Sequence, residues 1–152
     1  MFYDNNYSTF IIPILVLLVT RIIKFVTFYF RHGKNFEYTK KHAMSYGHMP
    51  SVHTALMTSM VTSVGYYTGV TSGAFAVSVV MAIIVVDDAT RLRVYMGRHS
   101  EYINLLKEKI NLSIEEYPDL KERMGHRVSE VIAGAIIGFI FTVFFIILFG
   151  IL

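Results

Sequence analysis

The stretch "YYTGVTSG", Tyr66 to Gly73, interrupts a long apolar run that extends from Val52 to Val86. The complete run is too long for one membrane-spanning helix, which needs about 20 residues. Glycines, threonines and a serine are typical of a tight turn. The run therefore predicts two helices joined by a short connection near its centre.

The composition favours a membrane protein. Of the 152 residues, 54% are hydrophobic, 14% aromatic and 16% charged, and a water-soluble domain of this size would struggle to bury so much apolar surface. Two further apolar runs, Ser8 to Phe30 and Val128 to Leu152, reach spanning length. We therefore predict an all-α integral membrane bundle of about four transmembrane helices, forming a single domain over residues 1–152.

Two features of the chain narrow its chemistry and its processing. The first apolar run follows a short leader and has no small-residue cleavage site after it, so we expect it to remain as a helix and not to be removed as a signal peptide. The chain has no cysteine, which excludes a disulfide framework and a thiolate metal site.

Most cations lie in the two polar segments, Arg31 to Pro50 and roughly Asp87 to Arg127, which hold 12 of the 14 Lys and Arg residues. With four spans, both segments lie on one membrane face. The positive-inside rule makes that face cytoplasmic, and an anion-binding site there would need the same cations. Between Ser100 and Met124 the apolar spacing predicts short amphipathic helices broken near Pro118, which either lie on the bilayer surface or cap the helix ends.

The ends of the first two predicted helices carry groups that can bind an anion. Lys24 lies near the end of the first helix, where a cation can snorkel to the interface or contact a ligand. Pro50 and Ser51 form a helix-start pattern, in which the serine caps and the first backbone N–H groups point out of the membrane. His53 stands in that first turn, where a lone histidine could equally satisfy a buried polar contact.

The next two predicted helices carry charged groups on the same face. Asp87 and Asp88 end the third apolar run, and Arg91 and Arg93 follow; such arginines form salt bridges or bind phosphate oxygens. His126 and Glu130 are four residues apart, so on a helix the carboxylate can hold the imidazole Nδ1–H while Nε2 faces outward. That pairing prepares a histidine as a nucleophile or base. The small residues that follow allow close helix packing: Ala133, Gly134, Ala135 and Gly138.

All four predicted helices thus place cationic or imidazole groups at their ends on one membrane face. Two histidines, a supporting carboxylate, cations and a helix N-terminus are the groups that phosphoryl transfer requires. We therefore predict a single site at this face.

Three motifs carry a resemblance to a known family. "GHMPSVHTA", "DDATRLRVYMGRHSEYIN" and "GHRVSEVIAGAIIG", in this order, resemble the divergent branch of the type 2 phosphatidic acid phosphatase superfamily, which is related to acid phosphatases and vanadium-dependent haloperoxidases. The likeness extends from about Lys24 to Gly138. It implies a metal-independent mechanism, without a cofactor, in which water hydrolyses a phosphohistidine.

The resemblance also implies the role of each site residue. His126 would be the nucleophile, with Glu130 at the position where most relatives carry aspartate, and His53 would be the general acid. The phosphate-binding residues would be Lys24, Arg93 and Ser51.

The chain departs from the family pattern at several positions. Val52 replaces a second serine, so one possible hydroxyl donor is missing. Arg91 stands where a glycine is common and Val94 where a second arginine is common, so Arg91 can substitute as a phosphate ligand. Arg31 can share the role of Lys24.

A second histidine competes for the role of nucleophile. "RVYMGRH", Arg93 to His99, itself looks like the Arg-to-His motif of the wider superfamily. We prefer His126 because Glu130 lies at the matching offset and the helix of the motif continues after it, whereas no carboxylate follows His99 at that offset.

The leading functional prediction is an integral-membrane phosphatase that acts on a lipid phosphate or diphosphate, such as a phosphatidate, a phosphatidylglycerophosphate or a polyprenyl diphosphate. The alternative is a non-catalytic membrane module that binds anionic lipid head groups or partner helices. A metal-dependent lipid transferase would require more clustered carboxylates than Asp87 and Asp88. Nucleic-acid binding is not expected, because the basic residues flank spans and no reader motif is present.

Overall fold

The fold is known from a computed structural model that describes residues 7–31, 36–42, 49–113 and 117–151. Over these residues every regular element is a helix, which confirms the predicted all-α class. The elements are α1 (Ser8–Arg31), α2 (Phe36–His42), α3 (Val52–Thr68), α4 (Gly73–Asp87), the π-helical turn η2 (Asp88–Leu92), α5 (Arg93–Lys109) and α6 (Val128–Ile151).

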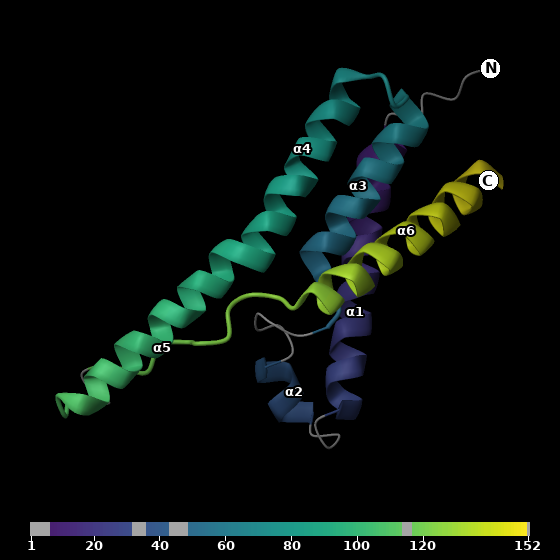
Figure 1. Cartoon of the computed structure of the whole chain (residues 1–152). Helices are drawn as coiled ribbons and strands as arrows, with labels where there is room; N and C mark the ends of the chain where they lie inside the picture. The colour runs from purple at the N-terminus through teal and green to yellow at the C-terminus, as the bar shows by residue number, and fades with distance from the viewer. Residues whose placement is uncertain (1–6, 32–35, 43–48, 114–116, 152) are drawn as a thin grey trace.

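Helix α3 is the centre of the bundle, since it packs against α1, α4 and α6 (Figure 1). The predicted turn between α3 and α4 is confirmed. Gly69 follows α3 with a φ of 87°, a conformation that favours glycine. Ser72 then caps α4, its hydroxyl accepting a hydrogen bond from the Phe75 N–H at 3.1 Å.

The third predicted helix does not end at the aspartates, so that boundary was wrong. Helix α4 continues through η2 into α5, giving one helix from Gly73 to Lys109. The charges do not stop it because each aspartate is paired: Asp87 with Arg91 at 3.2 Å and Asp88 with Arg93 at 2.6 Å. The π-turn joins the two α-helical segments without ending the helix.

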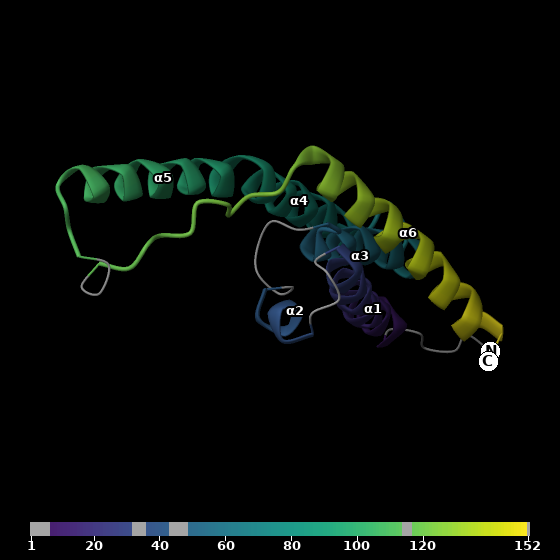
Figure 2. The same ribbon diagram turned by 90° about the horizontal axis from the view of Figure 1, so that it is seen from below.

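The segment after α5 also differs from the prediction of helices over Ser100 to Met124. The helix ends at Lys109, and Asn111 adopts a left-handed φ of 54°, as is common after a helix. Residues 117–127 are then not helical and run back along α5 to the bundle (Figure 2). We call residues 117–127 the return segment.

Three helices are long and apolar enough to cross a membrane: α1, the continuous α4–α5 helix, and α6. Helix α3 has only 17 residues, and its interior face is polar, with buried Ser59 and Ser63. The predicted count of four spans is therefore not confirmed. The Ser59 hydroxyl accepts a hydrogen bond from Thr142 of α6 at 2.6 Å, so α3 directs this polar group toward α6.

The predicted close packing by small residues is confirmed on α6. A Cβ added at Gly134 would collide with the Ser51 carbonyl oxygen, and one added at Gly138 would collide with the Ala55 carbonyl oxygen. The apolar core lies farther along the bundle, around buried Ile12, Val16 and Ile146. The first turn of α3 is thus held directly against the first turns of α6.

Candidate functional site

His126 lies just before α6 and is held there by backbone contacts. Its N–H donates to the Ala89 carbonyl oxygen in η2 at 2.9 Å. Next to it, Gly125 approaches Val94 so closely that a Cβ on the glycine would collide with the valine side chain. The loop before α6 is therefore fixed against the start of α5, and the side chain of His126 is buried, with 6% of its surface exposed.

Glu130 does not make the hydrogen bond that we predicted from the i, i+4 spacing. His126 precedes α6 and so lacks the helical geometry on which that prediction depended. The carboxylate instead accepts from the Arg127 N–H and from Arg123 Nη2, both at 3.1 Å. The bond from the Arg127 N–H to the Glu130 side chain is one of the two hydrogen bonds of a capping box. The buried Nδ1 of His126 has no hydrogen-bond partner among the described residues.

Four of the predicted site residues act electrostatically on His126: Lys24, His53, Arg93 and Glu130. Burial lowers the pKa of its imidazole below the ordinary value of 6.5. The positive charges of Lys24, His53 and Arg93 lower this pKa further, while the negative charge of Glu130 raises it. Lys24 from α1, His53 from α3 and Arg93 from α5 therefore act electrostatically on one imidazole before α6.

His53 is positioned by the capped start of α3. The Ser51 hydroxyl is buried, interacts with the Thr54 hydroxyl at 2.9 Å and accepts from the Thr54 N–H at 3.4 Å, as predicted for a helix cap. The Ser51 N–H donates to the Glu130 carbonyl oxygen at 3.1 Å, which ties this cap to α6. His53 itself is exposed and interacts electrostatically with Arg93 and Lys24.

The two arginines that the sequence left as alternatives occupy different surroundings. Arg93 is half-buried, is held by Asp88 through Nε, and acts on both histidines. Arg91 is exposed and pairs with Asp87, whose side chain is also exposed. Arg93 is thus the arginine whose charge acts on the histidines, and both arginines form the salt bridges that were the alternative interpretation.

Lys24 lies toward the C-terminal end of α1 and is buried, with 6% of its surface exposed. Glu130 is the carboxylate that acts on it most strongly, and Lys121 of the return segment also acts on it. A buried cation near a helix end, beside a carboxylate and two histidines, is not a snorkelling side chain.

His99, the competing nucleophile, lies on the exposed surface of α5. Helix α5 extends away from the rest of the bundle (Figure 1). His99 is therefore exposed, whereas His126 is buried.

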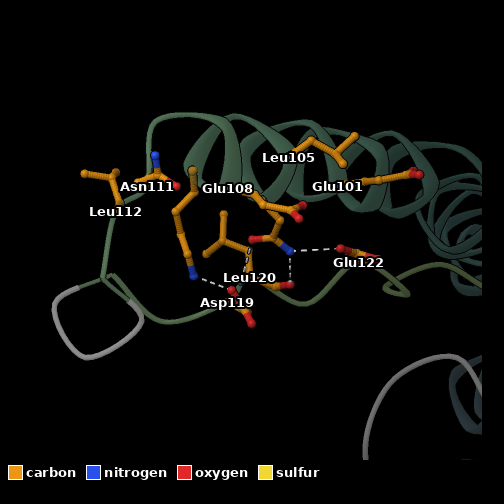
Figure 3. Close-up of a pocket in the computed structure, with 10 residues that line it drawn as sticks. Glu101, Leu105, Glu108, Asn111, Leu112, Asp119, Leu120 and Glu122 are labelled. Atoms are coloured by element: carbon orange, nitrogen blue, oxygen red, sulfur yellow. Dashed lines mark hydrogen bonds and ion pairs between the residues drawn. The ribbon is translucent and has the colours of Figure 1, made fainter.

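Helix α5 holds the return segment that leads to His126. The Asn104 side chain accepts from the Leu120 N–H and donates to the Leu120 carbonyl oxygen, both at 2.9 Å. Lys107 donates to the Tyr117 carbonyl oxygen at 2.8 Å and pairs with Asp119 (Figure 3). The cavity of about 870 Å³ between α5 and this segment contains no predicted site residue, so it belongs to the docking of the segment.

The sequence did not identify Arg123 and Asp88 as parts of the site. Arg123, which lies in the return segment, binds the Glu130 carboxylate. This contact follows only from the course of the segment in the structure. Asp88 orients Arg93 across η2, a pairing at a spacing of five residues that a regular helix would not predict. Within the described residues, no group of three His, Asp or Glu side chains could hold a metal ion.

The fold and this arrangement define a helical membrane protein that gathers histidines and cations at one end of its bundle. A match to the family described as "Divergent PAP2 family" covers residues 5–141. The chain is also 36% identical over 110 residues to the Bacillus subtilis (strain 168) protein described as "Uncharacterized membrane protein YuiD", which covers 64% of this chain and 70% of the relative. No solved structure gives a significant match.

The chain therefore belongs to the Divergent PAP2 family. The membrane-protein relative and the three long apolar helices agree that it is an integral membrane protein.

Proposed function

We propose that the protein is a phosphatase that hydrolyses the phosphate or diphosphate of a membrane lipid, with His126 as nucleophile and His53 as general acid. The observation that carries this proposal is that the contacts of Ser51 with Glu130 and of His126 with Ala89 hold the start of α3, η2 and the start of α6 together, so that the charges of His53, Lys24 and Arg93 act on the buried imidazole of His126. Family membership supports a phosphatase of the PAP2 type.

The reaction needs two steps on this chain's own side chains. A neutral imidazole nitrogen of His126 attacks the terminal phosphorus, and its bond to the leaving oxygen breaks, which is the lipid oxygen of a phosphate or the bridging oxygen of a diphosphate. Protonated His53 gives its proton to that oxygen. Neutral His53 then accepts a proton from water, whose oxygen attacks the phosphohistidine and releases phosphate and the free imidazole. Lys24 and Arg93 stabilise the charge on the phosphoryl oxygens, and no metal ion takes part.

Helix ends suit a substrate that is half in lipid and half in water. The acyl or prenyl tail can stay in the bilayer while the head group reaches His53, which is exposed. We further propose that this end of the bundle faces the cytoplasm, because the basic residues cluster there. The partners are then a phosphorylated lipid and the bilayer itself, and no nucleic acid.

The test is phosphate release from a panel of lipid phosphates with a chelator present. His126→Ala should lower the rate at least about a thousandfold, since it removes the nucleophile. His53→Ala should lower it about 10²–10⁴-fold, the usual contribution of a general acid. Vanadate should inhibit the wild type.

His99→Ala is the matched control, because His99 is exposed on α5, and its activity should equal that of the wild type. Loss of activity with chelator would contradict the metal-independent chemistry. A protein that binds anionic lipid vesicles equally well with and without His126, and releases no phosphate in either form, would instead be a non-catalytic lipid-binding module.

A further inference from the structure

A cavity of about 530 Å³ lies next to His126, since Arg127 and Glu130 line it, and the proposed reaction does not use it. Its walls come from the last turns of α1, the loop before α6 and the first turn of α6. It shares Glu130 with the histidine site. The two regions are therefore neighbours and can contact different parts of one ligand.

The lining of this cavity is cationic. Three arginines, Arg31, Arg123 and Arg127, face a single carboxylate, that of Glu130. Both carboxylate oxygens already accept hydrogen bonds, one from the Arg123 side chain and one from the Arg127 N–H. Glu130 therefore offsets only part of the positive charge, and the cavity has an excess of guanidinium groups.

The remaining lining fits a lipid head group. Thr27 and Ser129 supply hydroxyls, and Phe28 and Met49 supply apolar contact on one wall. Arg31 and Arg127 are exposed, so a charged group can enter from the water side. The positive-inside rule accounts for arginines on this face of the membrane, but it does not require three of them to line the same cavity.

We propose that this cavity binds a second anionic group of the substrate, next to the phosphate that His126 attacks. The inference rests on the proposed function and narrows its substrate class to lipids whose head group carries two anionic groups. Guanidinium groups bind phosphate oxygens through paired, charge-assisted hydrogen bonds. A lipid with a single phosphate fills only the histidine site and leaves the arginine cavity without a ligand.

The catalytic arm compares phosphatidate, which has one phosphate, with phosphatidylglycerophosphate and a polyprenyl diphosphate, which have two anionic groups. The quantity measured is the ratio of kcat/KM for each two-anion lipid to kcat/KM for phosphatidate. We expect at least one ratio to exceed about 10 in the wild type, since a hydrogen bond to a charged group contributes about tenfold or more.

Arg127→Gln and Arg31→Gln should reduce this ratio toward 1, mainly by raising KM for the two-anion lipid. The matched control is Arg98→Gln, an exposed arginine on α5 outside the cavity, which should leave the ratio unchanged. The proposal is wrong when the wild type shows no preference for either two-anion lipid. It is also wrong when the cavity variants lower kcat/KM for phosphatidate by the same factor.

A binding arm separates this inference from the catalytic proposal. The probes are soluble pyrophosphate and glycerol 1,3-bisphosphate, each compared with glycerol 3-phosphate, titrated calorimetrically into the detergent-solubilised His126→Ala protein. At least one two-anion probe should bind about tenfold more tightly than glycerol 3-phosphate, and Arg127→Gln should remove that difference. Equal binding of all three probes overturns the second site, even when phosphate release from lipids is observed.

The two arms also distinguish a lipid from a soluble ligand. Tight binding of a two-anion probe by a protein that prefers no two-anion lipid would assign the cavity to a free phosphate compound, and the lipid class proposed here would be wrong. Absence of phosphate release from every lipid would contradict the proposed function, while the calorimetric result would still decide the cavity.

Discussion

A buried imidazole without a proton is a stronger nucleophile than an imidazolium, and the surroundings of His126 favour the neutral form. Burial is the main cause that lowers its pKa below 6.5, and the charges of Lys24, His53 and Arg93 act in the same direction. Glu130 alone among these groups raises the pKa. The carboxylate therefore limits how far the pKa falls, and it does so without bonding to Nδ1.

The sign of this effect gives a pH prediction. In the proposed mechanism His126 attacks as the neutral imidazole, so its contribution to kcat/KM should be complete at neutral pH and be lost as the pH falls through its lowered pKa, below 6.5. Glu130→Gln removes the charge that favours the imidazolium, so the pKa should fall further. We expect the acid limb of the kcat/KM profile to move to lower pH in this variant.

Glu101→Gln is the matched control for the pH profile, because it makes the same change at an exposed carboxylate on α5 and should leave the acid limb in place. An acid limb that stays in place or moves to higher pH in Glu130→Gln would show that Glu130 does not act on His126 as proposed. The free energy of unfolding should also fall as the pH drops from 6.5 toward the lowered pKa of His126. Over that range the unfolded chain binds a proton that the buried imidazole does not.

At the scale of elements, the contact between α3 and α6 sets the distance between the two histidines. Gly134 and Gly138 lie against the Ser51 and Ala55 carbonyl groups, with no room for a Cβ. These neighbours are backbone atoms, which cannot turn away as a side chain can. The start of α3, which carries His53, can therefore lie this close to α6 only where α6 has glycine.

Gly134→Ala should consequently destabilise the protein by about 1–3 kcal/mol, the usual cost of overpacking, and should also lower phosphate release because it separates Ser51 from α6. Thermal unfolding in detergent, followed by circular dichroism, measures the first effect. Gly150→Ala is the control in the same helix, since nothing lies within 4 Å of the added Cβ. Equal unfolding temperatures for the two variants would contradict the close contact.

The sequence predicted those elements that depend on residues close together in the chain, such as turns, caps and runs of small residues. The turn at Gly69 to Ser72, the cap at Ser51 and the small residues of α6 are all readable from the chain. The continuous helix through Asp88 was not predicted, because charged residues after an apolar run look like an end when their partners are unknown. Arg123 was missed because the return segment brings it to Glu130, and no short-range pattern describes that path.

At the scale of the whole molecule, the helix ends divide into two groups. The start of α1, the connection between α3 and α4 and the end of α6 lie at one end of the bundle, while α2 and α5 lie toward the other (Figure 1). Helix α3 spans on the order of 26 Å, slightly less than the hydrocarbon core of about 30 Å. The buried Ser59 hydroxyl contacts Thr142 of α6 and Ser63 is also buried, so a short α3 can still cross the membrane.

This arrangement predicts that Thr71, between α3 and α4, lies on the opposite side of the membrane from Lys109, at the end of α5. The chain has no cysteine, so Thr71→Cys and Lys109→Cys each introduce a single site for a membrane-impermeant maleimide. In intact cells Thr71→Cys should be labelled, and Lys109→Cys only after the membrane is opened, if the basic end faces the cytoplasm as we propose. Labelling of both variants from the same side would mean that α3 and α4 enter and leave the membrane at one face and do not cross it. Labelling of Lys109→Cys alone in intact cells would keep four crossings and reverse the orientation.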